Sequence, residues 1–118
     1  MTSQARTPDD KDIAAAGITP TQLFTVFAHE RRQRTLAYLS QRAGAVSVGD
    51  LAEYIAIAEE TPTQDRYERI CTDLYHSHLP RMRDLGLLTY NLESEQISLT
   101  VRRRLLTPYL ELAGYPEA

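Results

Sequence analysis

The amino-acid sequence predicts a mainly α fold with a small β-hairpin, an α+β domain. Two observations predict this class. Helix-start signals, each a capping Ser or Thr ahead of apolar residues at helical spacing, recur along the chain. Residues 86–100, GLLTYNLESEQISLT, then alternate apolar and polar side chains around a polar turn, as hairpins do. The length of 118 residues fits one domain with one modest core.

The first predicted helix begins at Thr19, which is an N-cap residue followed by Pro20 at the first helical position. Apolar residues follow it at helical spacing. We expect Ala28-His29 to interrupt the helix before ERRQRTLAYLSQR resumes it, with Gly44 closing this region.

The second predicted helix begins at Ser47. Ser47 is a good N-cap, and Asp50 stands three residues later, where it can return the capping bond. Leu51, Ile55 and Ala58 then recur on one face. This helix is therefore short and amphipathic.

The third predicted helix is longer and runs from about Pro62 towards Asp84, because Thr61-Pro62 repeats the cap-then-proline signal. Pro80 removes one backbone hydrogen bond, so we expect a bend or restart around His78-Leu79. At 100° per residue the helix has an apolar stripe and an opposite polar face. The stripe comprises Tyr67, Cys71, Leu74, Tyr75, His78, Met82 and Leu85.

The order helix, helix, helix, β-hairpin, helix is that of a winged helix-turn-helix domain with a C-terminal extension. We expect a flexible tail over residues 1–17, the winged helix-turn-helix domain over 18–100 and a last helix over 101–118. An apolar stripe on a terminal helix of a small domain is easily buried across a two-fold axis, so we expect this helix to dimerise. The candidate dimerisation residues are Val101, Leu105, Tyr109 and Leu112.

The sequence argues against an enzyme, a metal site and a membrane protein. It contains no nucleophile elbow, zinc-protease motif or glycine-rich phosphate loop. The lone Cys71 falls on the apolar stripe, where an inert thiol is usual. Asp73 and His76 have helical chelate spacing, but two ligands are too few for a closed metal site. No apolar run is long enough to cross a membrane, so we expect a cytoplasmic protein without catalytic residues, metal, cofactor or small-molecule ligand.

The polar face of the third helix predicts DNA binding. In a winged helix-turn-helix this helix enters the major groove, where arginine makes paired bonds to guanine. The candidate reading residues are Gln64, Arg66, Arg69, Thr72, Asp73, His76, Ser77, Arg81 and Arg83. The candidate phosphate contacts are Arg31, Arg32, Arg34, Arg102, Arg103 and Arg104, although a solvated helix face is the alternative for the last three. We therefore expect a homodimeric transcriptional regulator whose partner is double-stranded DNA.

Three stretches carry a resemblance to a known family. HERRQRTLAYL, SVGDLAEYIA and LYHSHLPRMRDLGLLTYN are similar to a family of small haloarchaeal winged-helix proteins of unknown function, over roughly residues 20–100. More distantly, SHLPRMRDLGLL resembles the end of the recognition helix in ArsR-type repressors. The resemblance implies a dimeric archaeal transcription regulator. The metal-binding cysteine pair of classical ArsR sensors has no counterpart around Cys71, which is the one cysteine of the sequence.

Charge provides the evidence against DNA binding. The net charge is −3, and the turn of the expected wing is acidic at Glu93 and Glu95, which repels phosphate. Lys11 is the only lysine among 13 basic residues, which indicates a high-GC or halophilic source. Near 1 M salt the Debye length is about 3 Å, so short-range arginine bonds would then matter more than a broad positive field. The rival hypothesis is a winged-helix module that binds proteins and not DNA.

Overall fold

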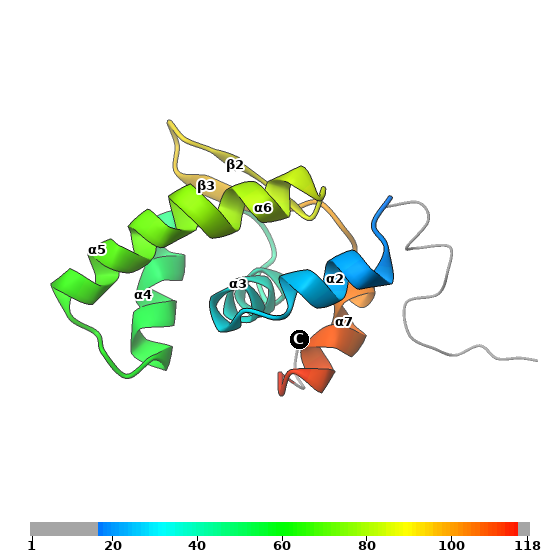
Figure 1. The fold of residues 1–118 in the computed structure, drawn as a ribbon. Helices are drawn as coiled ribbons and strands as arrows, with labels where there is room; N and C mark the ends of the chain where they lie inside the picture. Colours follow the sequence, from blue (N-terminus) through cyan, green and yellow to red (C-terminus); the bar gives the residue numbers. More distant parts are fainter. Residues whose placement is uncertain (1–16, 116–118) are drawn as a thin grey trace, which may run out of the picture.

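Helices packed against one another, with a small antiparallel sheet at one side, form the fold of the computed structural model, which describes residues 17–115 (Figure 1). The elements are, in order, α2 (Pro20–Val26), α3 (Glu30–Ser40), β1 (Val46–Ser47), α4 (Val48–Ala58), α5 (Gln64–Asp73), the π-helical turn η1 (Leu74–His78), α6 (Leu79–Asp84), β2 (Leu88–Asn91), β3 (Gln96–Leu99) and α7 (Arg103–Leu112). The predicted fold class, mainly α with a hairpin in winged-helix order, is confirmed. The expected tail over residues 1–17 lies almost wholly outside the described residues.

Local capping signals set the starts of the first helices. The Thr19 hydroxyl accepts from the Gln22 amide, and the Gln22 side chain accepts from the Thr19 amide, which completes a capping box. The predicted interruption is confirmed, because α2 ends at Val26 and α3 begins after His29. Ser47 caps α4 by accepting from the Asp50 amide at 2.9 Å, as its sequence spacing predicts.

The turn between α4 and α5 differs from the prediction. The Thr61-Pro62 start is wrong by two residues: Thr63 is the N-cap of α5, and its hydroxyl accepts from the Arg66 amide at 3.1 Å. Thr61 instead belongs to the end of α4, because its amide donates to the Ala56 carbonyl and its hydroxyl donates to the Glu59 carbonyl. An N-cap hydroxyl accepts from an amide later in the chain, whereas the Thr61 hydroxyl donates to a carbonyl earlier in the chain.

One long helix, α5 followed by η1 and α6, crosses the molecule above α4 and α3 (Figure 1). Its middle is a π-helical turn, in which the Leu79 amide donates to the Leu74 carbonyl five residues back. Pro80 follows in the first turn of α6, so the predicted restart near His78-Leu79 is confirmed. The wide turn lets the helix continue past a residue that has no amide hydrogen.

The sheet has strand order β1-β3-β2 and is antiparallel throughout. The hairpin β2–β3 is as predicted, and its register places Leu88 opposite Leu99 and Tyr90 opposite Ile97. The two-residue strand β1, which places Val46 opposite Ile97, was not predicted. Such a short strand has no periodicity of its own, so the sequence offers no signal for it.

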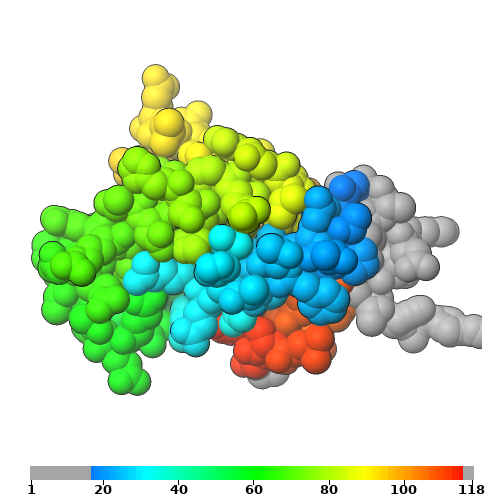
Figure 2. All heavy atoms as spheres, viewed as in Figure 1, coloured from blue at the N-terminus to red at the C-terminus, as the bar shows by residue number. Residues whose placement is uncertain are grey.

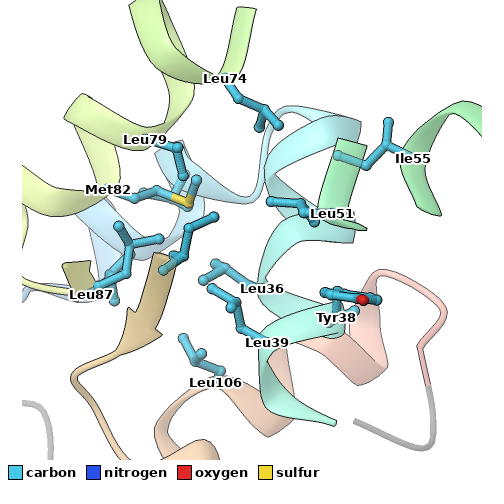
Figure 3. Close-up of a cluster of buried hydrophobic side chains, with 14 of the residues drawn as sticks. Leu36, Tyr38, Leu39, Leu51, Ile55, Leu74, Leu79, Met82, Leu87 and Leu106 are labelled. Atoms are coloured by element: carbon cyan, nitrogen blue, oxygen red, sulfur yellow. The ribbon is translucent and has the colours of Figure 1, made fainter. Parts of the chain in front are cut away.

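The core lies between the long helix, α3, α4 and α7 (Figure 3). Leu36 and Leu39 of α3 lie at its centre, and Leu51 of α4 approaches them from one side. Burying each such side chain contributes roughly 1.5–3 kcal/mol to folding. Leu106 of α7 lies on the same core, which anchors the last helix to the rest of the chain. Within residues 17–115, no helix has the length and apolar character needed to cross a membrane.

Candidate nucleic-acid interface

The outward face of the long helix carries most of the predicted reading residues. The exposed ones are Gln64, Arg69, Thr72, His76, Ser77, Arg81 and Arg83. The wing, which is the hairpin β2–β3, stands beside this helix and projects from the body of the molecule (Figure 2). A polar helix face and a protruding hairpin therefore lie on the same part of the surface.

Arg69 is the most accessible arginine of α5, with 73% of its side chain exposed. It pairs with Asp65 one turn earlier, at 3.2 Å between Nε and Oδ2. Gln64 similarly donates to Glu68 at 3.0 Å. Exposed pairs of this spacing contribute only about 0.2–0.5 kcal/mol, so Arg69 can exchange its carboxylate for a phosphate or a base edge at little cost.

Arg66 and Asp73 are committed to contacts within the chain. The Nη1 atom of Arg66 lies 3.5 Å from Oε1 of Glu59. Asp73 was expected on the reading face, but it is half-buried and accepts from Arg31 at 2.9 Å and from His78 at 2.8 Å. The structure therefore does not support Asp73 as a reading residue, because its carboxylate joins α5 to α3.

Arg31 is the centre of a partly buried network. Its Nε donates to Oε2 of Glu59 at 2.7 Å, its Nη2 donates to Oε1 of the same carboxylate at 3.0 Å, and its Nη1 donates to Asp73. The hydrogen bond from Arg31 holds the pKa of Glu59 below its usual range. The same bond raises the pKa of Arg31 above its usual value. The expectation that Arg31 holds a phosphate is therefore not supported, because all three contacts are internal.

Arg32 is also an internal residue, with 5% of its surface exposed. Its Nε donates to Nδ1 of His78 at 3.0 Å. Burial lowers the pKa of Arg32, and the charge of Arg81 lowers it further. An arginine sealed beneath the long helix cannot reach a DNA backbone, so the expectation for Arg32 is wrong. Arg34, predicted as a third phosphate contact, is half-buried and lies 3.9 Å from Glu30.

The wing has an acidic, apolar-tipped end. Leu92 is 67% exposed, and Glu93 and Glu95 beside it are exposed as well. Arg83 of α6 contacts strand β2 of the wing, where its Nη1 donates to the Tyr90 hydroxyl at 3.0 Å and its guanidinium lies over the ring. Arg83 is thus occupied in fixing the wing against the long helix.

The predicted arginine triplet precedes and begins α7. Arg102, Arg103 and Arg104 are exposed, and Nη2 of Arg103 donates to the carbonyl of Arg42 at 3.2 Å. The sequence pattern indicated either phosphate contacts or a solvated face, and exposure is compatible with both readings.

The predicted dimerisation stripe divides into buried and exposed parts. Leu105 and Tyr109 are buried in the chain's own core, and Val101 is half-buried, so the first two offer no surface to a second subunit. Leu112 is 81% exposed. Sequence analysis missed Phe24 of α2, which is 57% exposed and packs edge-on against Tyr109 at 5.2 Å between ring centroids. Leu112 lies one turn beyond Tyr109 on α7, so α2 and α7 each expose one large apolar side chain.

Metal and thiol chemistry have little support in residues 17–115. No group of three or more His, Cys, Asp or Glu side chains in this range is placed to hold a metal ion. Burial raises the pKa of the Cys71 thiol, although a hydrogen bond with Tyr67 opposes the rise. A thiol with a raised pKa is a poor nucleophile at neutral pH.

Comparison with known proteins assigns the chain to a family. The family model described as Domain of unknown function (DUF7344) matches residues 24–98, which run from α2 to β3. No curated protein and no solved structure matches the chain. The matched segment covers more than half of the chain, and the chain therefore belongs to the DUF7344 family.

Proposed function

We propose that the protein is a transcriptional regulator that binds duplex DNA through α5. The observation that carries the proposal is the outward face of α5, where Gln64, Arg69 and Thr72 are exposed beside a projecting wing. A helix placed on the surface by a preceding helix and a turn is the arrangement that enters a major groove. The resemblance to haloarchaeal winged-helix proteins and to ArsR-type repressors supports the same role.

Within this proposal Arg69 makes the strongest contact. A guanidinium released from Asp65 can bond a guanine edge in two places, or a phosphate, while Thr72 and His76 contact neighbouring groups. Arg66 stays with Glu59 and supports the turn that presents the helix. The acidic wing tip stays away from the backbone, so affinity comes from the helix and from short-range bonds.

A matched pair of variants tests the contact. Arg69→Ala and Asp65→Ala both break the same exposed ion pair, and Asp65→Ala also removes a carboxylate from the first turn of α5. Their effects on DNA are opposite: Arg69→Ala weakens duplex binding, and Asp65→Ala preserves or strengthens it. The measurement is duplex affinity against salt concentration, for a sequence enriched from random duplexes. If Arg69 contacts a phosphate, its loss reduces the steepness of the plot of log affinity against log salt concentration by about one. Equal affinities for both variants would remove Arg69 from the interface.

The proposed regulator acts as a homodimer. The support is the exposure of Phe24 and Leu112, because a second copy could cover apolar side chains that are otherwise in water. Selection from random duplexes tests the symmetry: a dimer enriches a palindrome whose half-sites lie about one helical turn apart. Leu112→Glu should weaken self-association and leave the fold intact.

One observation favours a second candidate, a protein-binding module. Leu92 is exposed at the wing tip next to Glu93, which suits a partner with a small apolar pocket and a basic rim. No enrichment from random duplexes at low or molar salt, together with normal folding, would favour this candidate over DNA binding.

A further inference from the structure

His78 is buried where the π-helical turn meets α6. It is 6% exposed, and both of its ring nitrogens are bonded. Nδ1 accepts from Nε of Arg32 at 3.0 Å, and Nε2 donates to Oδ2 of Asp73 at 2.8 Å. Because a guanidinium is only a donor, Nδ1 must carry no proton. The geometry therefore requires the neutral imidazole with its proton on Nε2.

Charged and titratable groups surround the ring from several elements. They are Asp73 of α5, Arg32 of α3, His29 before α3 at 5.7 Å between ring centroids and, one contact further out, Arg31 of α3 and Arg81 of α6. Burial lowers the pKa of His78, and Arg32 and His29 add to this effect. Asp73 opposes the lowering, since its charge and hydrogen bond favour the protonated ring.

We propose that His78 is a proton-sensitive joint, whose protonation breaks the bond from Arg32 and releases the η1 turn and the start of α6 from α3. A proton on Nδ1 would face the Nε–H of Arg32, so two donors and two positive charges would meet at a hydrogen-bond distance. One of the two side chains has to move. The adjoining turn is π-helical and precedes Pro80, where the regular backbone bonding of the helix is already altered. This inference concerns the free protein and does not rest on DNA binding.

Nuclear magnetic resonance of the full chain tests the joint directly. Nitrogen-15 shifts of the imidazole rings should show Nδ1 of His78 unprotonated at neutral pH, with a titration midpoint below the usual value of about 6.5. The Arg32 Nε resonance and the backbone amides of residues 74–79 should change at the same midpoint. The exposed His76, two residues away, is the internal control, and its ring resonances should show no coupling to Arg32. A midpoint at or above about 6.5, or a titration that leaves Arg32 and η1 unchanged, would overturn the proposal.

A substitution provides an independent test. His78→Gln keeps an acceptor for Arg32 and a donor for Asp73 but gains no proton in this pH range. Amide hydrogen exchange in η1 and α6, corrected for intrinsic rates, should then lose its acid-induced increase, and His76→Gln should retain it. Retention of the increase in His78→Gln would contradict the proposal. If that variant does not fold, the titration of the unmodified chain decides the question alone.

Discussion

Arg31 and Glu59 form a two-bond ion pair, at 2.7 and 3.0 Å, that joins α3 to the residue ending α4. The third nitrogen of the Arg31 guanidinium, Nη1, donates to Asp73 at the end of α5. One guanidinium thus connects α3, α4 and α5, and these contacts help to set the angle between α4 and α5 in the helix-turn-helix. Both side chains of the pair are mostly buried, at 22% and 19% exposed, so solvent screens them less than a surface pair.

Replacing Arg31 should destabilise the fold measurably. Arg31→Ala leaves the Glu59 and Asp73 carboxylates partly buried without this partner, and we expect the free energy of unfolding to fall by about 1–3 kcal/mol. Urea denaturation followed by circular dichroism measures the change. The control is Arg69→Ala, which breaks an exposed pair and should cost no more than about 0.5 kcal/mol. Equal losses of unfolding free energy in the two variants would show that the Arg31 network stabilises the fold no more than a surface ion pair does.

The same network should make stability fall at acid pH. The Arg31 bond lowers the pKa of Glu59; burial would raise the pKa of Asp73, but Arg31 and His78 lower it overall. A carboxylate with a lowered folded pKa stabilises the protein above its unfolded pKa and loses that contribution as pH falls through the folded value. The loss attributable to these two carboxylates therefore lies below about pH 4.5. Urea midpoints between pH 6 and pH 3 should fall less steeply in Arg31→Ala, and an unchanged slope would contradict the assignment.

The elements predicted correctly depend on residues close together in the chain. The Ser47 cap spans three residues, and the hairpin depends on alternation over fifteen, so both are visible in the sequence. Arg31 meets Glu59 across 28 positions, and Arg32 meets His78 across 46. No local pattern distinguishes these two arginines from solvated neighbours, which is why both were assigned to phosphate contacts.

The predicted stripe of α7 shows a second limit of sequence patterns. Periodicity correctly indicated that one face of the helix is apolar, but an apolar face can be buried against its own chain or against another. The stripe also missed Leu106 and Leu110, which are fully buried. A helix packed against both α2 and α3 buries a wider sector of its surface than the narrow apolar seam expected for a dimer contact.

Removing the cap of α5 should identify where that helix begins. Thr63→Ala removes the acceptor for the Arg66 amide, so we expect a loss of about 0.5–2 kcal/mol in the free energy of unfolding. Pro62→Ala is the control, because Pro62 lies before the cap and is exposed. Thermal or urea unfolding compares them. If Pro62→Ala lost more free energy of unfolding than Thr63→Ala, α5 would instead begin at the earlier position that Thr61-Pro62 suggests.

Two leucines of α7 should separate folding from self-association. Leu105 is 1% exposed, so Leu105→Ala creates a cavity and should lower the free energy of unfolding by about 2–5 kcal/mol at every protein concentration. Leu112 is 81% exposed, so Leu112→Ala should leave unfolding within about 0.5 kcal/mol and weaken only self-association. Urea unfolding at two concentrations and sedimentation equilibrium measure the two properties. If Leu105→Ala keeps full stability but weakens association, then the α7 stripe is used between subunits, because a residue that packs only inside its own chain cannot give that result.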